Sequence, residues 1–192
     1  MPEREKIGFP HTLRPILGSG VYMQEVPPVQ VPAIIQWMQN SDFGTGIRES
    51  VWTFPVVETT HVLSLAVSVG LLIWFDLRLL GWGMKHQPIS RIHEQIMPYV
   101  VAGFVIEIIT GFLLFWSEAE KCYVSIFFRA KVFFLFLAAF NAIIFEFRTK
   151  KTIEDWDKFP VPPPPARVAG WLSIVSWSAV IIAGRATAYS LF

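Results

Sequence analysis

The chain has 192 residues, of which 53% are hydrophobic and 16% are charged. Soluble domains are about 45–50% apolar, so this composition indicates a membrane protein. The formal net charge of +1 argues against nucleic acid as a partner. The single cysteine, Cys122, excludes an internal disulfide.

The first part of the chain predicts an extended arm followed by short surface helices. Prolines are too frequent in residues 1–31 for a helix, because proline removes a backbone donor and clashes with the preceding turn. Residues 32–52 then predict one or two interfacial helices on the outer surface of the membrane that the chain spans. Ser41 is the expected helix N-cap, and tryptophans lie at headgroup level. We therefore divide the chain into an N-terminal arm, 1–31, and a membrane domain, 32–192.

Four long apolar stretches lie in this domain, and each is long enough to cross a membrane. An α-helix rises about 1.5 Å per residue, so roughly 20 apolar residues span a hydrocarbon core of about 30 Å. The sequence therefore predicts an all-α, integral membrane four-helix bundle with an outer interfacial helix and an extended N-terminal arm. The stretches run approximately over Val56–Phe75, Ile96–Trp116, Ile126–Phe147 and Val168–Phe192.

Basic residues in the loops predict how the helices cross the membrane. The loops after the first and third stretches share one side and carry eight lysines and arginines, whereas the short loop after the second stretch carries only Lys121. Under the positive-inside rule the basic side is cytoplasmic. We therefore expect a multi-pass protein of the bacterial inner membrane with both termini outside. The basic residues are Arg78, Lys85, Arg91, Arg148, Lys150, Lys151, Lys158 and Arg167.

Ionisable residues inside the apolar stretches are the main functional signal. A charged side chain at the centre of a bilayer costs at least about 2.5 kcal/mol, so it needs a partner or a purpose. In a structural interpretation, Glu58 pairs with Arg185 and fixes helix register. Glu107 pairs with Lys131 in the same way, or Arg129 and Lys131 both reach the headgroups. The functional interpretations are a site for a cofactor, haem b or a quinone, and a path for protons or ions. The set comprises Glu58, His61, Glu107, Arg129, Lys131 and Arg185.

His61 is the natural metal ligand of this set, because it is the only histidine inside an apolar stretch. A buried neutral imidazole is a common iron ligand. Membrane haem b usually has two histidines on facing helices, but His86 and His93 are expected near the cytoplasmic end and His11 in the arm. A bis-histidine haem is therefore disfavoured. Haem would need a five-coordinate iron, a methionine or Lys131 as second ligand, or a ligand from another subunit.

Several motifs resemble those of a family of small bacterial four-span membrane proteins that is catalogued as a domain of unknown function. The resemblance covers about residues 33–192, implies the four-span fold and implies no activity. Members often carry a histidine after the final phenylalanine of the third span, where this chain has Glu146, and the arm is additional to the family. The residues to which the resemblance draws attention are Glu58, His61, Arg129, Lys131 and Arg185. The motifs are Ile47–Ser50, Pro55–His61, Asp76–Gly81, Thr110-Gly111, Phe127–Lys131, Asn141 and Ala183–Tyr189.

The leading functional interpretation is a non-catalytic integral subunit of a larger bacterial membrane complex, of a redox or energy-converting (electron-transfer) kind. The additional arm and an aromatic content of 15% favour contacts with membrane lipid and with other membrane protein subunits. The alternatives are a small b-type cytochrome or quinone-site protein that uses His61, and a proton or ion relay or transporter. An enzyme is the less favoured class, and bound lipid is expected.

Overall fold

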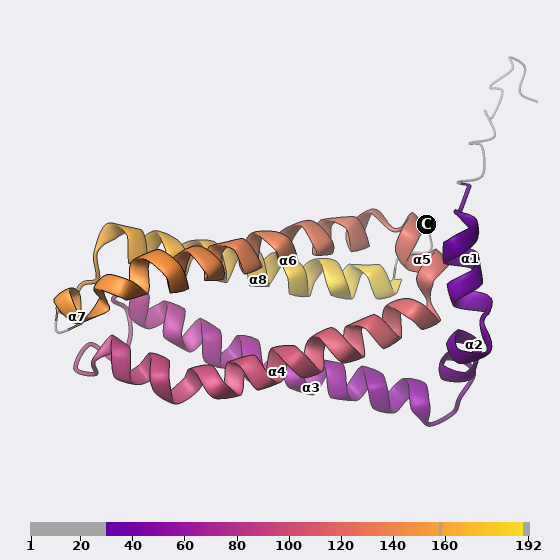
Figure 1. Ribbon diagram of the computed structural model, residues 1–192, viewed down its shortest axis with the longest axis horizontal. Coiled ribbons are helices and arrows are strands. Elements are labelled where there is room, and N and C mark those ends of the chain that lie inside the picture. Colours follow the sequence, from indigo (N-terminus) through magenta and orange to yellow (C-terminus); the bar gives the residue numbers. More distant parts are fainter. Residues whose placement is uncertain (1–29, 158, 190–192) are drawn as a thin grey trace, which may run out of the picture.

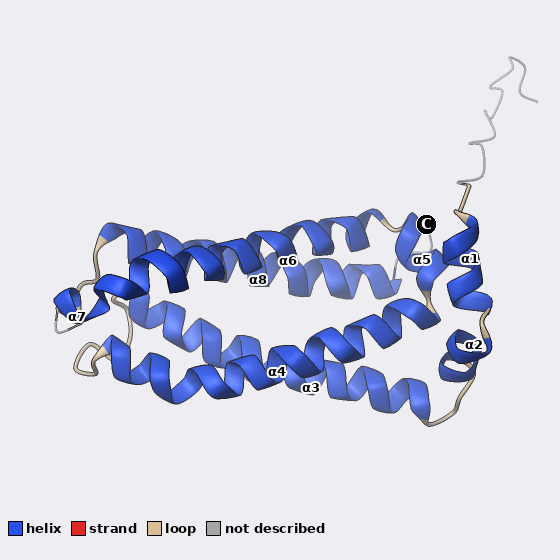
Figure 2. Ribbon diagram, viewed as in Figure 1, coloured by secondary structure: helices blue, strands red, loops and turns tan. Residues whose placement is uncertain are grey.

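The computed structural model describes residues 30–157 and 159–189, and every regular element in this part of the chain is a helix (Figure 1; Figure 2). Four helical segments in the same residues are long and apolar enough to cross a membrane. The predictions of an all-α fold and of four spans are therefore confirmed, and the chain is a multi-pass membrane protein. The spans are α3 (Thr53–Leu79), α4 (Ile89–Ser117), the segment Ile126–Trp156 and α8 (Pro164–Tyr189).

The third span is one continuous helical segment whose winding changes near its end. Helix α6 (Ile126–Ile144) passes into a π-helix at Phe145–Thr149, a 3-10 turn at Lys150–Thr152 and α7 (Ile153–Trp156). A π-helical turn is rare and occurs frequently at functional sites. The chain then returns through a short loop to Pro164, where proline suits the first turn of α8 because its missing N–H would have no partner there.

The four spans form two hairpins that lie side by side (Figure 1). Helix α3 packs against α4, α6 packs against α8, and α3 meets α8 to join the two hairpins. Buried apolar side chains form two clusters, one in the middle of the bundle and one at the end that carries α7, which we call the α7 end. The middle cluster consists of Val69, Ala138, Trp177 and Val180. The cluster at the α7 end consists of Phe75, Leu79, Ile89, Ile92, Phe145, Ile153, Trp156, Ala166 and Ala169.

Small residues let α3 approach both of its neighbours closely. A Cβ atom added to Gly103 of α4 would lie 2.7 Å from the Cβ atom of Ser68 on α3. A Cβ atom added to Gly170 of α8 would lie 3.1 Å from the carbonyl oxygen of Asp76 on α3. Close contact of this kind drives helix association in lipid, where apolar burial gives no advantage over contact with lipid tails. Helix α3 is therefore the central element of the bundle.

Short helices cover the opposite end of the bundle, which we call the capped end. Helices α1 (Ala33–Asn40) and α2 (Asp42–Arg48) cross the ends of the long helices beside α5 (Ala119–Val124) (Figure 1). The Ser41 side chain accepts a hydrogen bond from the backbone nitrogen of Gly44 at 3.1 Å, which confirms the predicted N-cap. The helices expected between residues 32 and 52 are thus present. The predicted arm lies outside the described residues, apart from its last two.

Arg48 fastens the cap to the second span. Its Nη1 atom donates hydrogen bonds to the carbonyl oxygens of Gln39 and Ser117, each at 3.0 Å. These carbonyls lie in the last turns of α1 and α4 and have no partner within their own helices. The indole nitrogen of Trp116 adds a bond to Ser41 Oγ at 3.0 Å. The cap is therefore a fixed part of the molecule.

Candidate functional site

A histidine and a carboxylate from neighbouring spans meet inside the bundle. His61 of α3 faces Glu107 of α4, and the distance from His61 Nε2 to Glu107 Oε2 is 3.5 Å. Their side chains are 15% and 13% exposed, so most of each is enclosed by protein. His61 lies nearer the start of α3 than its end, which places the pair in the half of the bundle toward the capped end.

Hydrogen bonds to Thr110 and Ser64 indicate which ring nitrogen of His61 carries a hydrogen and which oxygen of Glu107 accepts one. Thr110 Oγ1 donates its one hydrogen to the carbonyl oxygen of Ile106 at 2.7 Å, so it accepts a hydrogen from His61 Nδ1 at 2.9 Å. A neutral His61 ring then has its lone pair on Nε2, which faces Glu107. Ser64 Oγ donates to the other carboxyl oxygen, Glu107 Oε1, at 2.9 Å.

His61 Nε2 and Glu107 Oε2 are close enough to form an ion pair when the imidazole is protonated. For a hydrogen bond across this gap, a neutral imidazole needs a protonated carboxyl group as its donor, and an ionised carboxylate needs an imidazolium. Either arrangement would put one proton between the two side chains, and a change in the surroundings could move it from one atom to the other. The pair can therefore hold and exchange a proton within a membrane span.

Lys131 of α6 adds a cation from the other hairpin. It is close enough to act electrostatically on both His61 and Glu107. Its side chain lies against Gly184 of α8, where an added Cβ atom would be 3.6 Å from Lys131 Cδ and 3.7 Å from Nζ. Gly111 makes room for the imidazole, because a Cβ atom there would be 3.1 Å from His61 Cε1. Three of the six predicted site residues, His61, Glu107 and Lys131, thus lie near one another in the bundle.

The other three predicted residues do not join this site. Glu58 is exposed on α3, and among the described residues no ion pair joins it to Arg185, so the expected pair is not formed. Instead, Arg185 Nη2 donates to Tyr189 Oη at 2.6 Å, and its guanidinium carbon is 4.8 Å from the centre of that ring. The two residues share a face of α8, since positions i and i+4 are neighbours. Arg129 is also exposed and donates to the carbonyl oxygen of Tyr123 at 3.2 Å.

The structure corrects the expected partner of Glu107 and adds residues that the sequence analysis missed. Glu107, which was expected to pair with Lys131, lies 3.5 Å from His61, and Lys131 acts on it only electrostatically. From the sequence, Ser64 was given no place in the site and Thr110 was named only as part of a motif, although each lies three residues after one member of the pair. That spacing puts them on the same helix face and is a signal that could have identified them.

The surroundings of His61 do not fit a haem iron as they stand. Nδ1 faces Thr110 and Nε2 faces Glu107, so neither ring nitrogen is directed at an open coordination position. Across residues 30–157 and 159–189, no three histidine, cysteine, aspartate or glutamate side chains are grouped so that they could hold a metal ion. Metal binding by His61 stays a prediction, and it requires the ring to give up one of its two contacts.

A second histidine–glutamate pair lies at the α7 end. His93 of α4 is buried beside the rings of Phe75 and Phe145, and its Nε2 atom is 3.2 Å from Glu146 Oε2. Glu146 belongs to the π-helical turn and also pairs with Lys150. The position at which the resembled family often has a histidine therefore provides a carboxylate to His93 in this chain.

The chain belongs to a family of unknown function, DUF6644, whose family model matches residues 34–190. No curated protein and no solved structure gives a significant match. The resemblance found in the sequence is therefore confirmed. The matched residues include both histidine–glutamate pairs, whereas the predicted arm falls before them.

Proposed function

We propose that this member of the DUF6644 family is an integral subunit of a larger bacterial membrane complex of the redox or energy-converting kind. Its own contribution is a proton-exchanging site at which His61 and Glu107 contact the headgroup of a quinone dissolved in the membrane. The observation that carries the proposal is the approach of His61 Nε2 to within 3.5 Å of Glu107 Oε2 inside the membrane-spanning part of the bundle.

Quinone chemistry in a membrane needs a proton site of this type. The conversion of a quinone to a quinol takes up two electrons and two protons, and the protons must reach oxygens that lie away from bulk water. We assign the supply of electrons to other subunits of the complex. Glu107 and His61 would hold and pass the protons, and the Lys131 ammonium would stabilise negative charge on a partly reduced quinone oxygen.

A small b-type cytochrome built on His61 is supported less well. Both of its ring nitrogens already have partners, and its second ligand would have to come from a residue other than a histidine of the bundle. His93, the other histidine of the spans, is at the α7 end and pairs with Glu146 there. A quinone headgroup requires only hydrogen-bond donors and acceptors, and it would take the place of one of the contacts that His61 and Glu107 now make.

The capped end suits contact with other subunits. Helices α1 and α2 are held on α4 by Arg48 and Trp116. They present Ile34 and Trp37, each 59% exposed, as a fixed apolar surface. The arm expected to bind partners is connected to α1 at this surface. We therefore place partner subunits at the capped end and, from the positive-inside rule, assign this end to the outer face of the bacterial inner membrane.

A proton relay is the second candidate, because the His93–Glu146 pair gives the bundle a proton-holding site at each end. Chains of intramembrane histidine and glutamate residues serve as relays in pumps and transporters. In proteoliposomes, a relay would conduct protons down a pH gradient, and Glu107→Gln and Glu146→Gln would each reduce the flux. A quinone-site subunit would conduct no protons in the absence of its redox partners.

Purification of the full, tagged chain from native membranes in a mild detergent tests the proposal. We expect it in a complex much larger than its own 21.9 kDa, together with redox subunits and quinone-dependent electron transfer. His61→Gln and Glu107→Gln should leave the complex assembled and lower quinone turnover about a hundredfold, as expected for the loss of an acid–base group. Glu94→Gln removes an exposed carboxylate from the same helix as Glu107 and is the matched control.

The two parts of the proposal can fail separately. Recovery of the chain without other subunits would overturn its role in a complex. Unchanged quinone turnover in assembled complexes that carry His61→Gln or Glu107→Gln would overturn the site while leaving membership of the complex intact.

A further inference from the structure

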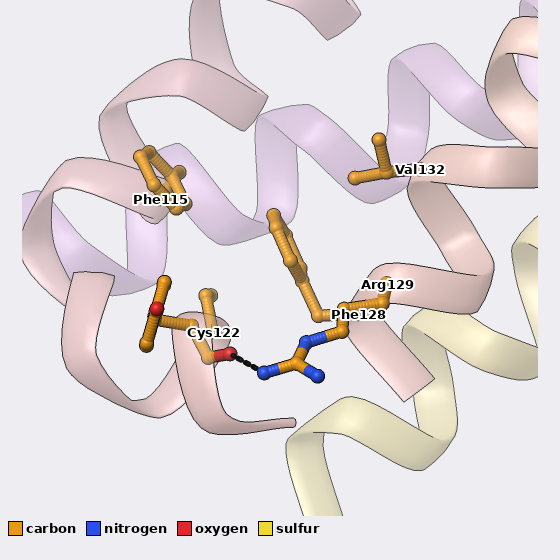
Figure 3. Close-up of a pocket in the computed structure, with 6 residues that line it drawn as sticks. Phe115, Cys122, Phe128, Arg129 and Val132 are labelled. Carbon is orange, nitrogen blue, oxygen red and sulfur yellow. Dashed lines mark hydrogen bonds between the residues drawn. The ribbon is translucent and has the colours of Figure 1, made fainter. Parts of the chain in front are cut away.

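An open apolar hollow of about 350 Å³ lies at the capped end, between the end of α4, α5 and the start of α6 (Figure 3). Its walls are aromatic rings, a valine and the thiol of the only cysteine, and one arginine completes them. No residue of the His61 site lines it. The lining residues are Phe115, Cys122, Tyr123, Phe128, Arg129 and Val132.

Arg129 brings an uncompensated positive charge to this hollow. It has no acidic partner among the residues that the structure describes, and its Nη2 atom donates to the carbonyl oxygen of Tyr123 at 3.2 Å. Its guanidinium carbon lies 5.8 Å from the centre of the Tyr123 ring. These contacts hold the side chain beside the hollow (Figure 3) without neutralising it. The remaining N–H groups form a planar fork that matches phosphate oxygens.

The hollow lies at the level where lipid tails meet their headgroups. Arg129 is in the first turn of the third span, and Cys122 and Tyr123 belong to the short helix before it. A cation near the end of a span reaches the headgroup level. The apolar walls beside it then face the upper part of an acyl chain.

We propose that the hollow binds one anionic phospholipid, with an acyl chain against Phe115, Phe128 and Val132 and the phosphate held by Arg129. The charge of the site selects the headgroup. A zwitterionic lipid such as phosphatidylcholine carries its own cation beside the phosphate, whereas phosphatidylglycerol does not. An arginine without an acidic partner therefore favours phosphatidylglycerol.

Native mass spectrometry of the full chain, with phosphatidylglycerol and phosphatidylcholine present in equal amounts, tests this site. We expect about tenfold preferential retention of phosphatidylglycerol, because the choline cation of phosphatidylcholine offsets the phosphate charge beside Arg129, and tenfold corresponds to about 1.4 kcal/mol. Arg129→Gln should abolish the preference, and Val132→Trp should fill the hollow and lower the retention of both lipids. Lys121→Gln removes a cation at the same end that is already 3.5 Å from Glu118, so this matched control should keep the preference.

Cys122 provides a second readout that needs no substitution, because it is the only cysteine of the chain and lines the hollow. Its alkylation by iodoacetamide should be slower in nanodiscs of phosphatidylglycerol than in nanodiscs of phosphatidylcholine. Equal retention of the two lipids by the natural sequence, or a preference that survives Arg129→Gln, would overturn the proposal. Equal alkylation rates in the two kinds of nanodisc would also overturn it.

Discussion

At the scale of single residues, the hydrogen bond to Thr110 favours the tautomer of His61 that carries its hydrogen on Nδ1. Its hydroxyl group donates to Ile106 and accepts from His61 Nδ1. Loss of the hydroxyl leaves a ring N–H without a partner in an apolar setting, which costs about 1–3 kcal/mol. We expect Thr110→Val to lower the melting temperature of the detergent-solubilised protein, measured by intrinsic tryptophan fluorescence. Thr110→Ser keeps the hydroxyl group and is the control, and equal melting temperatures for the two variants would contradict this account.

Cys122 is a residue whose reactivity is set by burial. Burial raises the pKa of Cys122 to about 11, and the nearby Glu118 carboxylate acts in the same direction. Only the thiolate is a nucleophile, so at pH 8 about one molecule in a thousand is reactive. Alkylation by iodoacetamide, followed by intact-protein mass spectrometry, should therefore accelerate about tenfold per pH unit from pH 7 to 10. A rate that levels off near pH 9 would show that the thiol is not perturbed.

At the scale of elements, the packing of α3 on α4 depends on Gly103. A Cβ atom there would be 2.7 Å from the Cβ atom of Ser68, a distance that forces the helices apart. Overpacking of this kind costs about 1–3 kcal/mol, so Gly103→Ala should lower the melting temperature. Gly70 lies in α3 with no atom within 4 Å of an added Cβ. Gly70→Ala is therefore the matched control, and a similar loss of stability in both variants would contradict the close contact.

The spans could be predicted from the sequence, whereas their ends could not. Long apolar stretches predict helices in lipid because a spanning segment must satisfy its backbone polar groups internally. Helix α4 nevertheless begins at Ile89 and not near Ile96, because Ile89 and Ile92 are buried in the cluster at the α7 end. The π-helical turn at Phe145–Thr149 was also not predicted. Apolar periodicity over five residues does not distinguish a π-helix from an α-helix.

At the scale of the whole molecule, the depth of each polar residue could be predicted, but its direction around the helix could not. Counting residues along each span places the predicted set in one half of the bundle, and the three residues of the site do meet there. Glu58 and Arg185 lie in the same half but face away from the site. The rotation of each helix depends on contacts between helices, such as the one at Gly103. Such contacts are tertiary and leave no local pattern.

The connection between the cap and the bundle depends on Arg48. Arg48→Met removes the hydrogen bonds to the carbonyl oxygens of Gln39 and Ser117. We expect faster amide hydrogen exchange in α1 and α2 with little change in α3, because local opening needs less free energy than global unfolding. Hydrogen-exchange mass spectrometry measures both regions in one experiment.

The control for this prediction is Glu49→Gln, since Glu49 is 3.9 Å from Arg48 and its side chain is 70% exposed. An exposed ion pair of this kind contributes little to stability. Unchanged exchange of α1 and α2 in Arg48→Met would mean that the aromatic contacts of Trp116 with Trp37 and Phe43 hold the cap without the arginine.

The location of His61 and Glu107 on consecutive spans has a consequence for the biosynthesis of the chain. Helices α3 and α4 leave the ribosome one after the other. The histidine and the carboxylate can therefore partner each other within a single hairpin before the third span has been translated. The penalty of inserting an ionisable group into lipid is thereby lowered at the moment of insertion. Lys131 follows on the third span and enters a membrane in which its electrostatic partners are already in place.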